Sequence, residues 1–122
     1  MKLLLDTHTL VWWDSGELPR PVSRRIESAE VVFVSAVVAW EIAIKSSLGR
    51  IVAKAPVEAV LEDYGFLELA VSIRHADKVR TLPLHHRDPF DRLLVAQALV
   101  EDLVIVSADR LLREYKAPIV WD

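Results

Sequence analysis

Four acidic residues stand where a carboxylate is costly. Each of Asp6, Glu41, Asp91 and Asp109 ends, opens, follows or interrupts a run of apolar residues. A lone ionised carboxylate near a protein core is strongly unfavourable unless something neutralises it. Four such residues in one small chain indicate a shared cation. Because they are far apart in the sequence, only the fold can bring them together.

The chemistry that these acids support best is hydrolysis of a phosphodiester. Carboxylate oxygens select Mg²⁺ or Mn²⁺ over zinc or copper. A metal held by three or four acids keeps open positions, where it can bind a phosphate oxygen and lower the pKa of a water molecule. The chain has no cysteine, and we find no Ser–His pair that would act as a covalent nucleophile instead.

Two of the acids also have purely structural explanations. Asp6 can cap the helix that follows it, and for a lone Asp at a strand end the two interpretations are about equally favoured. Glu41 can form an ordinary ion pair with Lys45, four residues later in the same helix. The apolar residues on nearly all sides of Glu41 argue against that pair, because the helix is expected to be buried.

The other two acids can be explained as helix-start residues. With Asp88 as the N-cap and Pro89 as the first helical residue, Asp91 stabilises the helix start through the helix dipole. For Asp91 alone we favour this structural explanation. Asp109 can likewise be a first-turn acid after an N-cap at Ser107. Each of these explanations works for one acid taken alone. Together they explain less well why all the positions expected at one edge of the predicted sheet carry an acid.

Histidine and tryptophan provide weaker candidates. His85 and His86 are adjacent in a loop and have no partner at metal-ligand spacing, so they are interpreted as loop residues. His8 either approaches the acids or has a surface role. There is no phosphate-binding glycine-rich loop, since the chain has only three glycines. Core or interface positions are predicted for three tryptophans, Trp12, Trp13 and Trp40.

Composition points to one domain. The chain has 122 residues, is 52% apolar and contains no cysteine, which fits the reducing cytoplasm. We see no secretory or membrane segment in it. The apolar excess predicts well-buried strands and an apolar interface with another chain. The net charge of −3 neither demands nor excludes a nucleic-acid partner.

Short apolar runs alternate with helical patterns, which predicts a parallel α/β sheet of about five strands covered by helices. Ligands of such sheets bind beyond the carboxyl ends of the strands, where we expect Asp6, Glu41 and Asp109. The helix whose first turn holds Asp91 leads into the fourth strand. A crossover helix of this kind is not normally expected to start at that edge, and the local pattern alone does not decide the question. Strands are predicted at 2–5, 31–34, 66–71, 103–106 and 119–121. Helices are predicted at 7–14, 22–28, 35–48, 57–63, 72–82, 89–100 and 109–115, with a turn at 18–21.

Four segments of the chain combine the acids with characteristic neighbours. They are Leu3-Leu4-Leu5-Asp6-Thr7-His8; Val34-Ser35-Ala36 through Trp40-Glu41-Ile42-Ala43-Ile44-Lys45; His85-His86-Arg87-Asp88-Pro89-Phe90-Asp91-Arg92-Leu93-Leu94 with Ala96-Gln97-Ala98; and Val106-Ser107-Ala108-Asp109. Each segment alone is weakly diagnostic, but four in the same order are specific, and together they span the chain. In these segments the chain resembles the PIN-domain ribonucleases, specifically the VapC-type toxins of bacterial toxin–antitoxin pairs.

The resemblance implies a single PIN domain over residues 1–122, with five parallel strands in the order 3-2-1-4-5. It implies catalytic and metal-binding roles for all four acids, with Asp6 and Asp91 holding Mg²⁺ or Mn²⁺ most directly, and it gives the capping role to Asp88. It also implies a homodimer, an RNA substrate, a VapB-type antitoxin and contact with DNA only through that antitoxin. Supporting roles near the acids are implied for Thr7, Ser107, Arg92 and Lys45.

The function expected from these observations is an endoribonuclease toxin that uses metal-activated water. Two other classes of function remain open. One is a phosphoacceptor or phosphatase-like α/β domain with Asp6 as nucleophile, although no second acid stands within two residues of Asp6. The other is a catalytically idle binding module whose acids only cap helices.

Overall fold

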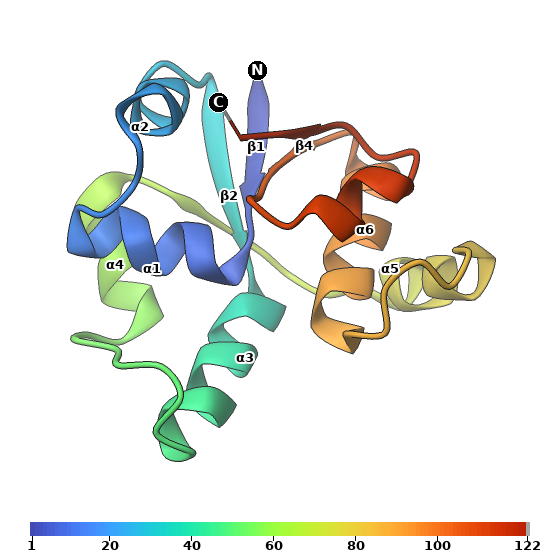
Figure 1. Cartoon of the computed structure of the whole chain (residues 1–122), viewed down its shortest axis with the longest axis horizontal. Coiled ribbons are helices and arrows are strands. Elements are labelled where there is room, and N and C mark those ends of the chain that lie inside the picture. The colour runs from blue at the N-terminus through green and yellow to red at the C-terminus, as the bar shows by residue number, and fades with distance from the viewer. Residues whose placement is uncertain (122) are drawn as a thin grey trace.

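The computed structural model describes residues 1–121 and shows a five-stranded parallel sheet between two groups of helices (Figure 1). The strand order is β3-β2-β1-β4-β5, and every neighbouring pair is parallel. The order expected from the resemblance is therefore confirmed. The strands are β1 (Lys2–Leu5), β2 (Val31–Ser35), β3 (Leu67–Leu69), β4 (Val104–Val106) and β5 (Ile119–Val120).

The helices lie on both sides of this sheet. In Figure 1, α1, α2 and α4 lie on one side of the strands and α5 and α6 on the other, while α3 extends from the end of β2. The helices are α1 (Thr7–Ser15), α2 (Arg20–Glu27), α3 (Ala36–Ser47), α4 (Val57–Tyr64), α5 (Ile73–Lys78) and α6 (Pro89–Glu101), with 3₁₀ helices η1 (Val79–Thr81) and η2 (Arg110–Glu114). Within residues 1–121, no helix is both long and apolar enough to cross a membrane.

Strand β1 lies at the centre of the sheet and forms the middle of the core. Leu3, Leu4 and Leu5 are all buried, although successive side chains of a strand point to opposite faces. Both faces of β1 are therefore covered, as expected for a parallel strand written as a continuous apolar run. On β4, Ile105 and Val106 are buried in the same way.

Polar side chains begin several helices at the carboxyl edge of the sheet. Asp6 accepts a hydrogen bond from the backbone N–H of Thr9 and caps α1. Ser35 accepts one from Val37 N–H and caps α3. Asp88 caps α6, as predicted. These caps satisfy backbone donors that have no partner inside the helix, and they place short polar side chains around the strand ends.

The structure differs from the predicted elements in a few places. The helix predicted at 22–28 starts at Arg20, inside the predicted turn, because Pro21 has a backbone angle suited to a first helical turn. The strand predicted at 66–71 is only Leu67–Leu69, at the edge of the sheet. The helix predicted at 72–82 is the α-helix α5 followed by the 3₁₀ helix η1. The helix predicted at 109–115 is the 3₁₀ helix η2 instead of an α-helix. The connection from β4 to the adjacent β5 is short, and its i to i+3 bonds make a tighter turn.

The expectation that α6 starts away from the carboxyl edge was wrong. In a parallel sheet, the chain leaves one strand at the carboxyl edge and must enter the next at the opposite edge. A helix that leads directly into a strand therefore runs antiparallel to that strand and begins near the carboxyl edge. Helix α6 does this just before β4, and its first turn contacts the same cavity as the end of β1.

Candidate active site

A cavity of about 410 Å³ opens at the carboxyl edge of the sheet. It lies beside β1 and β4, where the strand order reverses direction, which is the usual ligand position in an open α/β sheet. All four predicted acids line it. The lining residues are Asp6, Thr7, His8, Trp12, Glu41, Lys45, His86, Asp88, Asp91, Ala108 and Asp109.

Asp6 is held at the junction of β1 and β4. Because Leu5 pairs with Val106, the next residues of the two strands, Asp6 and Ser107, lie side by side. The hydroxyl of Ser107 donates to Asp6 Oδ2 at 2.5 Å, and the backbone and hydroxyl of Thr9 donate to Oδ1 at 2.9 and 2.6 Å. Burial raises the pKa of the Asp6 carboxyl, while these hydrogen bonds oppose the rise. Asp6 therefore both caps α1 and lines the cavity.

Glu41 lies one turn and a half into α3 and is only 4% exposed. The hydroxyl of Thr7 donates to Oε1 at 2.5 Å, and Lys45 forms an ion pair with Oε2. The hydrogen bond to Glu41 is the main cause that raises the pKa of Lys45. The argument that burial disfavours the Glu41–Lys45 pair was wrong, because the aliphatic stem of a lysine can lie along a buried helix while its amine stays near water.

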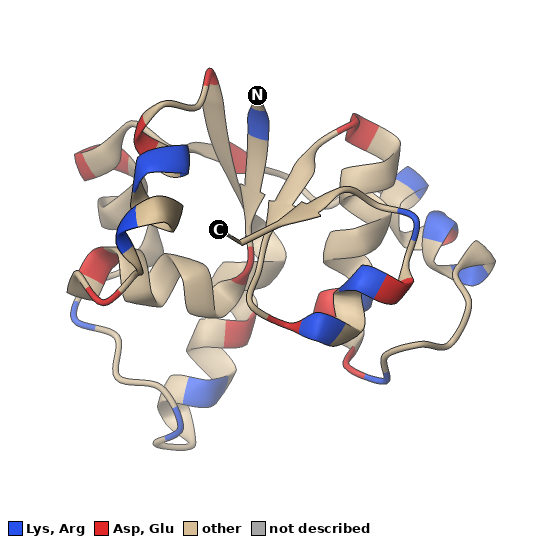
Figure 2. Ribbon diagram, turned by 45° about the horizontal axis from the view of Figure 1, so that its top comes forward, with Lys and Arg blue, Asp and Glu red and all other residues tan. Residues whose placement is uncertain are grey.

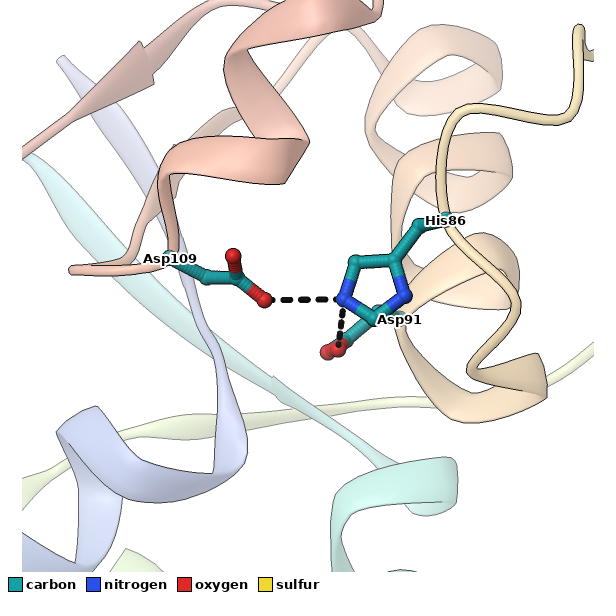
Figure 3. Close-up of side chains that lie close together, drawn as sticks. All are labelled: His86, Asp91 and Asp109. Carbon is teal, nitrogen blue, oxygen red and sulfur yellow. Dashed lines mark hydrogen bonds and ion pairs between the residues drawn. The ribbon is translucent and has the colours of Figure 1, made fainter.

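His86 lies between Asp91 and Asp109 (Figure 3). Its Nε2 is 2.9 Å from Asp109 Oδ2 and 3.3 Å from Asp91 Oδ2. Its Nδ1 accepts the backbone N–H of Asp88 at 3.0 Å, so the proton of a neutral ring sits on Nε2 and points at the two acids. Within residues 1–121, these three side chains are the group whose possible ligand atoms all lie within 4.8 Å of one another. Asp6 and Glu41 line the same cavity outside this group.

Asp91 is the acid whose proton affinity the cavity changes most clearly. Its pKa is raised to about 7, mainly by burial and further by the charges of Asp88, Asp6 and Glu41, while the charge of His86 opposes the rise. The acids that line the cavity are therefore close enough to repel one another. Figure 2 shows acidic segments of the ribbon gathered where α3, α6 and the strand ends meet.

Arg92 has a different position from the other predicted supporting residues. Its guanidinium turns to the loop before α6, where it donates to Pro83 O at 2.9 Å and to the Tyr115 hydroxyl at 3.1 Å. That hydroxyl also accepts the backbone N–H of His86 at 3.0 Å. Arg92 does not line the cavity, and it contacts the loop that carries His86.

Three cavity residues were missed or left open by the sequence. His86 was interpreted as a loop residue, Trp12 as core or interface, and His8 was left undecided, yet all three line the cavity. For His8 and Trp12 the available signal was their position on the helix that Asp6 begins. For His86 no local signal distinguishes it from His85, because its role depends on how the loop folds back onto α6.

Comparison with known proteins identifies the family. The model of the PIN domain matches residues 3–118. The chain belongs to the PIN-domain family. A curated relative, Ribonuclease VapC22 of Mycobacterium tuberculosis, is 30% identical over 121 residues, which cover 95% of this chain and 93% of the relative. This PIN domain is therefore a member of the VapC ribonuclease branch.

Solved structures show the same fold. The crystal structure of VapBC2 from Rickettsia felis, bound to a promoter DNA fragment, contains a chain that matches with a TM-score of 0.75 and 15% identity over 100% of both chains. DNA-bound VapBC from Salmonella typhimurium matches with a TM-score of 0.73 and 17% identity, covering 98% of this PIN domain and 97% of that chain.

The raised pKa of Asp91 predicts how stability depends on pH. An ordinary carboxyl in the unfolded chain loses its proton near pH 3.8, whereas folded Asp91 keeps it to about pH 7. The stability that comes from keeping Asp91 protonated in the folded state is therefore complete below pH 3.8. It is lost as the pH rises through about 7. In EDTA, Asp91→Asn should raise the Tm of this PIN domain more at pH 8 than at pH 5, measured by thermal denaturation.

The matched control is Asp63→Asn, which removes an exposed acid outside the cavity. We expect it to change the Tm by similar small amounts at both pH values. A gain from Asp91→Asn that is the same at pH 5 and pH 8 would contradict the assignment of a raised pKa to Asp91.

Proposed function

We propose that this PIN domain is a Mg²⁺- or Mn²⁺-dependent endoribonuclease and acts as the toxin of a VapBC-type pair. The observation that carries the proposal is the convergence of Asp6, Glu41, Asp91 and Asp109 on one cavity in a chain of the VapC branch. The cavity offers carboxylate oxygens and no thiolate, a donor set that suits these hard cations. Their mutual repulsion, visible in the raised pKa of Asp91, would be relieved by a bound cation.

Different acids would have different roles toward the cation. Asp6 and Asp91 would hold it most directly, with Glu41 and Asp109 completing the site or binding a second ion. His86 fits the role of a hydrogen-bond donor to Asp91 and Asp109 better than that of a ligand. Its Nδ1 already accepts the Asp88 N–H, so the Nε2 that faces the acids carries the proton and has no free lone pair.

The metal would supply charge stabilisation at the phosphate and acidify a water molecule for attack on phosphorus. The chain's own residues would keep the acids in place. Ser107 and Thr9 orient Asp6 through hydroxyl hydrogen bonds, and Thr7 and Lys45 orient Glu41 from two sides. Fixed carboxylates of this kind reduce the reorganisation needed when the substrate arrives.

Metal binding should stabilise the folded protein. A ligand that binds only the folded state adds about 2.7 kcal/mol at a concentration of 100 times its dissociation constant. We expect Mn²⁺ or Mg²⁺ to raise the Tm of the wild-type chain and to have little effect on Asp6→Asn. Thermal denaturation with increasing metal tests this. An equal shift in Asp77→Asn and Asp6→Asn would indicate non-specific binding, since Asp77 is exposed on α5, outside the cavity.

RNA cleavage is the direct test of the proposed activity. We expect the purified protein to cut total RNA with Mg²⁺ or Mn²⁺ and to stop cutting in EDTA. Asp6→Asn should reduce the rate by at least about 100-fold, the scale of losing one well-placed electrostatic contact. The control variant Asp77→Asn should keep the wild-type rate. Equal rates for wild type and Asp6→Asn, or equal rates with and without metal, would contradict the metal–acid mechanism.

The partners are proposed on the same basis. The Rickettsia and Salmonella proteins of this fold were solved as VapBC complexes bound to DNA, so we propose a VapB-type antitoxin for this chain and contact with DNA only through it. Large apolar side chains on the surface, among them Leu48, Ile73 and Leu84, support an interface with a second copy of the chain and with the antitoxin. We expect the pair to act in the cytoplasm, where its RNA substrate is found.

Expression in a bacterial host tests the role as a toxin. We expect induction of the wild-type chain to stop growth, and Asp6→Ala to remove the effect at the same protein level. Co-expression of the product of a neighbouring small gene should restore growth. Growth arrest by Asp6→Ala equal to that of the wild type would show that toxicity does not depend on the acids.

A further inference from the structure

A row of aromatic rings leads away from the acid cavity. His8 and Trp12 are four residues apart on α1, so they share one helix face, and their ring centroids are 5.5 Å apart. Trp12 then makes an edge contact with Trp121, just after β5, at 6.0 Å. His8 is exposed, and Trp12 and Trp121 are partly exposed. We refer to His8, Trp12 and Trp121 as the aromatic strip.

The strip starts inside the proposed active site. His8 and Trp12 line the same cavity as the four acids, and Asp6 caps the helix that carries them both. A side chain in the first turn of α1 and another one turn later therefore form one wall of the cavity. A group bound against Trp12 would lie next to a group held by the acids.

Trp12 differs in this respect from the other tryptophans near it. Trp13 packs on Tyr64 and Phe66, with centroids 5.5 and 5.7 Å apart, away from the cavity. Trp40 is 61% exposed and contacts Phe90, and neither of them lines the cavity. Among the tryptophans within residues 1–121, Trp12 is the one that combines a partly exposed ring with a position in the cavity wall.

Charge limits what can bind there. The cavity wall carries five acidic side chains, and its lysine, Lys45, already pairs with Glu41. Without a bound cation such a surface repels the phosphates of RNA. Beside a phosphate held by the metal, the contacts that the cavity wall itself offers are therefore ones that need no positive charge. Stacking of a base on an aromatic ring is such a contact, and single-stranded RNA presents unstacked bases for it.

We propose that Trp12, supported by His8 and Trp121, is the stacking surface for an RNA base next to the phosphate that is cut. The proposal rests on the proposed ribonuclease function and adds a substrate contact to it. In this proposal the uncharged ring of Trp12, on the helix that Asp6 caps, contributes to RNA binding. Trp12 is thus a positioning residue for the substrate, separate from the acids that hold the metal.

Fluorescence of a base analogue tests this contact directly. The protein is the full chain with Asp6→Asn, which we expect to bind RNA without cutting it. The probes are single-stranded 12-mers of uridine in which one base at a time is 2-aminopurine, whose fluorescence falls when it stacks. We expect one probe position to be quenched on binding. Adding Trp12→Phe should keep this quenching, whereas Trp12→Leu should abolish it and weaken binding roughly 5- to 150-fold.

The control is Trp40→Leu in the same background, the same replacement at an exposed tryptophan outside the cavity. It should leave both the quenching and the dissociation constant unchanged. Unchanged quenching in Trp12→Leu, an equal loss in Trp40→Leu, or no binding of any probe would overturn the proposal. If Trp12→Leu changed the sedimentation coefficient of the protein but not its RNA binding, the proposal would also be overturned. The aromatic strip would then be an interface between chains. Metal-dependent RNA cleavage by the wild type would leave the ribonuclease function standing in each of these cases.

Discussion

The parallel pairing of β1 with β4 sets the position of Asp6, which lines the cavity, and of Ser107, which holds the Asp6 carboxylate in place. Leu5 lies beside Val106 in the sheet, so the first polar residue after each strand meets the other at the carboxyl edge. The Ser107 hydroxyl then binds the Asp6 carboxylate at 2.5 Å. A shift of one residue in this register would move Asp6 away from Ser107 and turn apolar side chains to the wrong face. The buried leucines of β1 therefore hold the site in place as much as they hold the core together.

The acids around this junction are costly, and their neighbours offset the cost only in part. Hydroxyl groups donate to Asp6 and Glu41, Lys45 pairs with Glu41, and His86 lies between Asp91 and Asp109. Burial still raises the pKa of both Asp6 and Asp91. A fold selected only for stability would replace such acids by neutral or apolar residues. Their convergence on one cavity is consistent with the proposed cation, whose charge would offset the repulsion that the neighbouring residues leave in place.

Much of the fold could be predicted because it depends on local signals. Continuous apolar runs marked the central strands, and short polar caps marked the starts of α3 and α6, at Ser35 and Asp88. The less accurate regions were those where tertiary packing overrides local preference: the short edge strand β3, the helix start at Arg20, and the 3₁₀ turn η2 between two adjacent strands. For Asp91 the error was in the direction of α6, which follows from the parallel sheet and not from the helix's own residues.

By itself, the sequence determined the residue types that define the chemistry. It identified four acids beside apolar segments, the capping residues and, through ordered motifs, the PIN-domain family. Only the tertiary structure decided which side chains meet in the cavity. It brought in His86 from a loop, placed His8 and Trp12 on the cavity wall, and turned Arg92 toward loop carbonyls. The physical reason is that a cap or an apolar run is a local interaction, whereas the approach of side chains from separate helices depends on strand order and on crossover direction.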